Sequence, residues 1–239
     1  MKSYHPRHIH HHFLRNLHIP TALCAALIVA SVLSVGAFVF ASTTINFRMV
    51  INPGTLSIGM VDGNFVPLID PAITMQPKLQ SNICQSSVGI LGTFAAQIYV
   101  KNPDAADGGW VATLSTASPE AKWQWDAYSF DFNDPTSSGC IDGDDADVVG
   151  GQMRVDMSAS HIHLGTCLAS CSWLDVVRWS SAAFHEWMID TIALLSASSG
   201  SSDLGDWVLH DIAVTQTIPA NQWISENYYL DLYLSITSV

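Results

Sequence analysis

The residues of this chain that could do chemistry begin with a run of aspartates. Six of them fall within seventeen positions, in a stretch interrupted by proline and glycine: Asp131, Asp134, Asp142, Asp144, Asp145 and Asp147. Calcium takes six to eight oxygen ligands from flexible loops, and closely spaced carboxylates on a glycine-containing turn can supply them. The EF-hand pattern is not met, because Ala146 occupies its third ligand position. Asp142, Asp144, Asp145 and Asp147 therefore predict a structural calcium ion, and a solvated acidic loop is the alternative.

Two histidines also have a spacing that suits metal binding. His161 and His163 flank Ile162, so both imidazoles project from the same face of a strand. Two ligands with no cysteine or carboxylate close in sequence are too few for a site, and we expect two exposed side chains. His185-Glu186 begins like a zinc-protease helix, but Ile189 stands where that motif needs its second histidine.

No motif of a known catalytic mechanism occurs in the chain. It contains no G-x-S-x-G elbow, no phosphate-binding loop and no dinucleotide fingerprint, and Glu120, Glu186 and Glu226 are far apart in sequence. Glycoside hydrolysis needs two carboxylates that can be far apart in sequence and meet only in the folded protein, so the sequence leaves this activity open. We expect a protein that is not an enzyme.

Aromatic residues offer a second kind of binding site. Of eight tryptophans, Trp123 and Trp125 share one face of a strand by their spacing, with Asp126 beside them. Exposed tryptophan next to a carboxylate can hold a sugar, whereas most tryptophans on strands fill the core. Trp123, Trp125 and Asp126 are therefore the candidate ligand platform, with core packing as the alternative.

The elements that must position these residues are indicated by alternating apolar residues. Period-two runs are short and are mostly bounded by Gly, Pro, Asn or Asp, which is typical of antiparallel strands. They include Ile45 to Ile51, Leu56 to Met60, Ala96 to Val100, Trp110 to Leu114, Met153 to Met157 and Leu230 to Ile236. The sequence predicts an all-β fold, an antiparallel β-sandwich. Leu230, Leu232, Leu234 and Ile236 should face one core.

One stretch leaves its secondary structure open. Between Arg178 and Leu195, apolar residues recur at spacings of three and four, which fits one short amphipathic helix. The β-branched and aromatic content near its end fits a strand equally well.

The start of the chain has the pattern of an export signal. Residues 1 to 16 are basic and histidine-rich, and residues 19 to 40 are apolar and carry no charge. Val39-Phe40-Ala41 suits signal peptidase, so we expect residues 1–41 to be a signal peptide or an uncleaved membrane-anchor helix. Residues 42–239 then form a single exported domain. The protein contacts a membrane only through residues 19–40, and only if these are uncleaved.

Cysteine usage agrees with export. Beyond Cys24 in the apolar run, the chain has four cysteines: Cys84, Cys140, Cys167 and Cys171. In an oxidising compartment we expect two disulfides, and sequence alone does not choose among the three pairings. The close spacing of Cys167 and Cys171 allows a local bridge, which would leave Cys84 with Cys140. Zinc would need C-x-x-C pairs or partnered histidines, and neither is present.

The charge composition of the chain limits which macromolecules it can bind. Nine basic residues against 21 acidic ones give a net charge of −12, and Lys2, Arg7 and Arg15 all precede the apolar run. A body this acidic has no basic face for phosphates, so nucleic acid is excluded as a partner. With 49% hydrophobic and 13% charged residues, the chain is also not a charge-rich disordered protein.

Several segments resemble those of secreted bacterial envelope proteins. These are Thr217 to Gln222 followed by Tyr228 and the last strand, the Asn52 to Leu56 turn, Trp207-Val208-Leu209, and Gly109 to Leu114. The nearest family is the WxL surface domain, which these segments resemble over about half of the exported part. The resemblance implies a β-sandwich attached non-covalently to the cell wall.

Together these features predict an exported cell-surface protein with a structural or adhesive role in the envelope. Its expected partners are an envelope polymer or other surface proteins, and its only expected cofactor is the calcium ion. A secreted carbohydrate-binding module is the alternative, and a concave, solvent-facing tryptophan patch would distinguish it.

Overall fold

A computed structural model describes Met49 and residues 54–103, 108–135, 150–166, 175–201, 203–225 and 227–239. The chain divides into two units, Met1–Val50 and Ile51–Val239, and every described residue except Met49 belongs to the second. Within the described ranges all regular elements are strands, and none is a helix long and apolar enough to cross a membrane.

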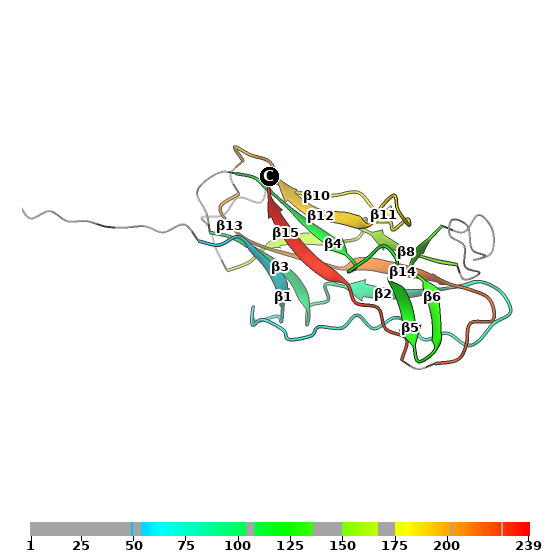
Figure 1. Ribbon diagram of the computed structural model, residues 1–239. Coiled ribbons are helices and arrows are strands. Elements are labelled where there is room, and N and C mark those ends of the chain that lie inside the picture. Colours follow the sequence, from blue (N-terminus) through cyan, green and yellow to red (C-terminus); the bar gives the residue numbers. More distant parts are fainter. Residues whose placement is uncertain are drawn as a thin grey trace, which may run out of the picture. The chain divides into compact units, whose positions relative to one another are not determined.

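Most of the strands are labelled in Figure 1. Their bounds are β1 (Ser57–Val61), β2 (Gln85–Leu91), β3 (Gln97–Asn102), β4 (Trp110–Ser115), β5 (Lys122–Trp125), β6 (Tyr128–Asp131), β7 (Asn133–Asp134), β8 (Gly151–Asp156), β9 (His161–Leu164), β10 (Val176–Arg178), β11 (Ala182–Ala183), β12 (Thr191–Ala197), β13 (Gly205–His210), β14 (Ile212–Ile218) and β15 (Tyr233–Ser238).

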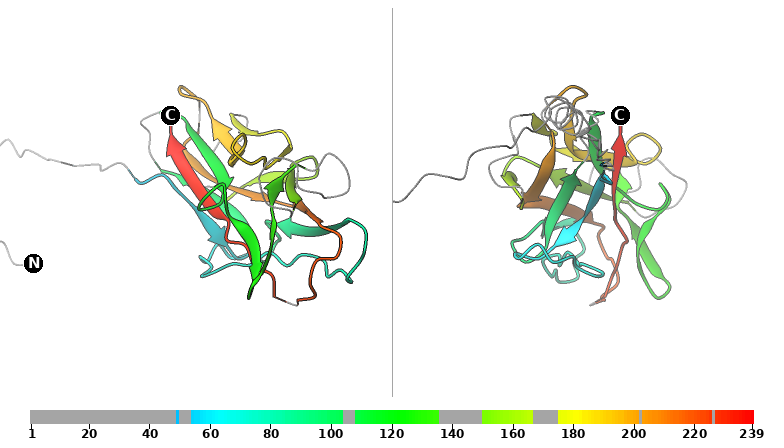
Figure 2. Two further views of the ribbon diagram at one scale, coloured as in Figure 1. Left: turned by 45° about the vertical axis from the view of Figure 1, so that its right-hand side comes forward. Right: turned by 90° about the vertical axis from the view of Figure 1, so that its left-hand side faces the viewer.

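These strands form several antiparallel sheets. One sheet has the order β1-β3-β13-β9, a second has β11-β8-β14-β2 with β7 paired to β8, and a third has β10-β12-β4-β15. The hairpin β5–β6 forms a small sheet of its own. Figure 2 shows the C-terminal strand β15 running beside β4, as their register requires.

The first two sheets are continuous through a shared corner. Only Asp211 separates β13 from β14, and it adopts a left-handed backbone with φ of 62°. The neighbouring strand β2 ends at Leu91, and the carbonyl of the next residue, Gly92, accepts a hydrogen bond of 2.9 Å from the Asp211 N–H. Gly92 has φ of 80°, and a Cβ there would lie 2.8 Å from the His210 Cα. The corner therefore requires glycine at position 92.

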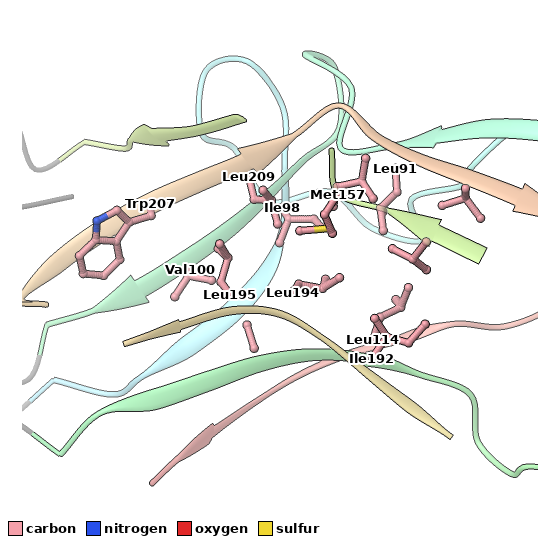
Figure 3. Packing of buried hydrophobic residues seen from close by; sticks show 14 of the residues in the cluster. Leu91, Ile98, Val100, Leu114, Met157, Ile192, Leu194, Leu195, Trp207 and Leu209 are labelled. Atoms are coloured by element: carbon pink, nitrogen blue, oxygen red, sulfur yellow. The ribbon is translucent and has the colours of Figure 1, made fainter. Parts of the chain in front are cut away.

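The core lies between these sheets and the third sheet. Val100, Trp207 and Leu209 of β3 and β13 meet Leu114 and Leu195 of β4 and β12 in one buried cluster (Figure 3). Sheets packed face to face through inward side chains are consistent with a β-sandwich.

The alternation read from the sequence is confirmed in these strands. In β4 the residues Trp110, Ala112 and Leu114 are buried, while the residues between them are partly exposed. Ile98 and Val100 of β3 are likewise buried. Leu230, Leu232, Leu234 and Ile236 all pack against the same core, as predicted.

The helix considered between Arg178 and Leu195 is wrong. The stretch contains β11 and most of β12, and β12 pairs with both β10 and β4. Its register shifts between Ala193 and Leu195, which marks a β-bulge. The bulge lets Ile192, Leu194 and Leu195 all be buried, so the three-residue spacing from Ile192 to Leu195 belongs to an interrupted strand.

Candidate binding groove

A groove of about 650 Å³ opens at one end of the described strands. One wall is the extended segment 72–81, and the floor includes the end of β14. The far wall combines the β5–β6 hairpin with residues 218–225 and 227–229. The volume is typical of sites that hold a small ligand.

The extended wall is fixed to the second sheet at its edge strand. The Gln76 N–H donates to the Val88 carbonyl at 2.9 Å, and the Ser87 hydroxyl donates to the Gln76 carbonyl at 2.6 Å. Further along, the Gln85 side-chain amide donates to the Leu79 carbonyl at 2.7 Å. These bonds hold a segment without regular secondary structure in a defined position.

The hairpin presents stacked aromatic pairs on one face. Trp123 is directly opposite Phe130 and Trp125 is opposite Tyr128, and each pair stacks with ring centroids 5.9 and 5.6 Å apart. Tyr228 packs edge-on against Phe130, at 5.2 Å. Cross-strand aromatic pairs stabilise such a short hairpin, which would be marginal alone.

Buried Gln216 sets the orientation of Trp123. Its Oε1 accepts a hydrogen bond of 2.9 Å from the Trp123 indole N–H. Its Nε2 donates to the carbonyls of Asp131 and Thr217 at 3.0 and 2.8 Å. Because Gln216 is fully engaged, the indole that it holds has a fixed position in the groove.

The outer rim carries exposed aromatic rings. Trp223 and Tyr229 are each 59% exposed and line the groove. The Tyr128 ring lies 4.7 Å from the Trp223 ring, and Tyr229 exchanges backbone hydrogen bonds with Gln124 of the hairpin. The rim is therefore connected to the hairpin and stays open to solvent.

Uncharged polar groups complete the lining. Amide side chains come from both walls: Gln76, Gln80, Gln85, Gln216, Gln222 and Asn227. Among the described lining residues only Lys78 is charged, in a chain whose net charge is −12. An amide both donates and accepts hydrogen bonds, so this lining suits a ligand with many hydroxyl groups.

The three residues of the sequence-derived platform have different places. Trp123 lines the groove, whereas Trp125 is not part of its lining and packs against Tyr128 and Tyr228. Asp126 is in the hairpin turn with φ of 51°. The structure adds Trp223 and Tyr229, which sequence reasoning missed because no period-two pattern includes them. An amide residue followed directly by an aromatic one, in Gln222-Trp223 and again in Asn227-Tyr228-Tyr229, is a signal that could have found them.

The other sequence candidates are only partly within the described residues. Asp142, Asp144, Asp145 and Asp147 lie outside them, as do Cys140, Cys167 and Cys171. Cys84 is half-buried immediately before β2. Asp131, from the start of the acidic run, forms an ion pair of 2.9 Å with Lys122. Calcium binding and disulfide pairing stay predictions.

The His185-Glu186 pair and the WxL-like segments lie in surroundings that explain them as parts of the fold. His185 Nδ1 lies 3.1 Å from the carbonyl oxygen of its neighbour Glu186, and no helix surrounds them. Trp110 and Trp207, the tryptophans of the two WxL-like segments, are buried with ring centroids 5.7 Å apart. With the side chains in the positions that the structure gives them, no three or more His, Cys, Asp or Glu residues of the described ranges are arranged to hold a metal ion.

Neither models of protein families, nor curated proteins, nor solved structures match this chain.

Proposed function

We propose that this chain is an exported, non-enzymatic cell-surface β-sandwich protein that adheres through its groove to a neutral carbohydrate polymer. The observation that carries the proposal is the pair of solvent-facing rings, Trp223 and Tyr229, at the rim of a concave groove whose inner ring, Trp123, is held by Gln216.

The lining supports a sugar as the ligand. The faces of a pyranose ring carry C–H groups that pack on aromatic rings, and indole and phenol side chains combine an apolar body with a polar edge. The hydroxyl groups of the sugar need donors and acceptors around it, which Gln80 and Asn227 provide. Gln222 adds an acceptor oxygen, since its Nε2 already donates to the Ser129 carbonyl and to the Tyr228 hydroxyl. The net charge of −12 repels a polyanion, and Lys78 is the one charge among the described lining residues that could offset this repulsion, so an uncharged polymer fits better.

The cell-surface part of the proposal rests on the sequence. The basic and apolar leader supports export, and the four later cysteines suit an oxidising compartment. An adhesive envelope role and a carbohydrate-binding role then describe one protein, in which the groove is the adhesive site.

The experiment is a binding titration of the full chain against soluble neutral polysaccharides, namely β-glucan, mannan and xylan, with polygalacturonate as the acidic comparison. Intrinsic tryptophan fluorescence and affinity electrophoresis both report binding. We expect at least one neutral polymer to bind and polygalacturonate to bind more weakly.

Two tryptophan variants locate the site. Trp223→Ala should weaken binding by at least about 10-fold, because truncating an aromatic residue that anchors a ligand costs about 2 kcal/mol or more. Trp179→Ala is the matched control, since Trp179 is also exposed but does not line the groove. Absence of binding to all the polymers, or equal affinity of both variants, would contradict the proposal and favour a purely structural envelope role.

A further inference from the structure

A group of three histidines lies on the outer face of the first sheet, away from the groove. His161 and His163 come from β9, and His210 comes from the adjacent strand β13. The register places His210 directly opposite His161, while Val208 is opposite His163. His161 and His163 are exposed, and the alternating residues Ile162 and Leu164 pack on the core.

The three imidazole rings are close together. The His210 ring centroid lies 4.7 Å from that of His163 and 5.7 Å from that of His161, and the two β9 rings are 6.3 Å apart. Sequence reasoning set this motif aside because two histidines are too few ligands. The pairing of β9 with β13 supplies the third, from a position 47 residues after His163.

A carboxylate orients one of the rings. His210 Nδ1 lies 2.7 Å from Asp211 Oδ2. When Nδ1 donates its proton to a carboxylate, Nε2 is the unprotonated nitrogen that can bind a metal, and this arrangement accompanies metal-bound histidine in many proteins. Asp211 keeps this position because it is the corner residue between β13 and β14, with φ of 62°.

We propose that His161, His163 and His210 bind a divalent transition-metal ion such as Zn²⁺, with Asp211 as the residue that positions His210. Imidazole is a preferred ligand of Zn²⁺, and three protein ligands leave a fourth position for water or for a ligand from a partner.

Binding requires a change of side-chain rotamers. The rings of His163 and His210 are nearly parallel, at 6°, so their nitrogens do not converge on one point. His161 and His163 are exposed, and exposed side chains change rotamer within nanoseconds, so the ion can select a converging arrangement of these two rings at little cost.

The experiment must separate this site from the histidine-rich leader. We therefore use the full chain with His5, His8, His10, His11, His12 and His18 changed to alanine, which leaves His185 as the one histidine outside the cluster. Calorimetric titration with Zn²⁺ should show one site per chain. Thermal unfolding at about 100 times the dissociation constant should shift upward by roughly 5–10 °C.

Variants in this background test each residue. His163→Ala and His210→Ala should abolish the zinc-dependent shift, whereas His185→Ala should retain it. Asp211→Asn keeps a residue that tolerates the left-handed backbone, and it should weaken zinc binding by about 10- to 100-fold. Circular dichroism without metal checks that each variant is folded. No zinc-dependent shift in the parent chain, or a shift that survives in His163→Ala, would overturn the proposal.

Discussion

Single polar side chains determine much of the local geometry of this protein. Gln216 makes three hydrogen bonds and thereby positions Trp123. The Asp206 carboxylate accepts hydrogen bonds from the hydroxyl groups of Thr166 and Tyr99. Burial and the hydrogen bond to Asp206 raise the pKa of the Tyr99 hydroxyl, so the phenol stays protonated and remains a donor. Asp156 shows a similar local effect with the opposite sign.

The carboxyl group of Asp156 should titrate at unusually low pH. Its pKa is lowered from 3.8 to about 2, first by the Ser158 backbone N–H and then by the Ser181 hydroxyl. Since the folded-state pKa lies below the unfolded one, this group stabilises the fold above about pH 4, and its contribution is lost as the pH falls towards 2. NMR titration should show the low pKa in the wild type and a higher one in Ser181→Ala. An unchanged pKa in that variant would contradict the assignment, and Ser180→Ala is the control.

At the scale of elements, three chain segments turn between the first and second sheets. β2 continues to β3 through residues 92–96, β8 to β9 through residues 157–160, and β13 to β14 through Asp211. Because β2 and β8 flank β14 while β3 and β9 flank β13, these turns belong to one corner. The corner fixes both the position of Asp211 beside His210 and the direction of β14 towards the groove.

Replacing the corner glycine should destabilise the whole sheet. In Gly92→Ala the new methyl group would lie 2.8 Å from the His210 Cα and 2.9 Å from the Leu209 carbonyl oxygen, with φ of 80°. Backbone strain of this kind costs about 1–3 kcal/mol, to which the steric overlap adds. Urea unfolding monitored by tryptophan fluorescence measures the loss. Gly59→Ala in β1 is the control, since its methyl group would have no neighbour within 4 Å; comparable losses in the two variants would refute the role of the corner.

At the scale of the whole molecule, the proposed export of the protein and the expected pairing of its last four cysteines support one another. A protein exported to an oxidising compartment gains stability when a disulfide restricts its unfolded chain. The net charge of −12 gives the molecule a negative field that attracts cations such as calcium. Both properties lead to predictions about the intact chain.

We expect Cys84, Cys140, Cys167 and Cys171 to be paired in the exported protein. Closure of a loop between Cys84 and Cys140 should contribute on the order of 2–4 kcal/mol. Non-reducing mass spectrometry of the exported chain should show a mass lower by four hydrogens than that of the reduced chain. Alkylation of any of these four residues without prior reduction would show that pairing is incomplete.

We also expect calcium to stabilise the chain through Asp142, Asp144, Asp145 and Asp147. Extracellular sites of this kind bind calcium at about 10⁻⁴ to 10⁻³ M, and saturation at 100 times the dissociation constant adds about 2.7 kcal/mol. Thermal unfolding in millimolar calcium should therefore occur at a higher temperature than in chelator, and Asp144→Asn should lose the difference. Equal unfolding temperatures in the two buffers would leave a solvated acidic loop.

The sequence by itself determined the fold class, because a strand that buries one face has apolar residues at every second position. Trp110, Ala112 and Leu114 are buried in β4 as their spacing requires, and the last strand packs through Leu234 and Ile236. The assignment between Arg178 and Leu195 was ambiguous because a bulge adds one residue, and spacing alone cannot distinguish an interrupted strand from a helical turn.

Only the tertiary structure decided which residues meet in the two sites. Trp123 lies beside Gln216 across 93 residues of sequence, and His163 lies beside His210 through the pairing of β9 with β13. Alternation states which face a side chain occupies, but it carries no information on which strands become neighbours. Strand pairing depends on how all the apolar faces are buried together, and that is a property of the folded chain as a whole.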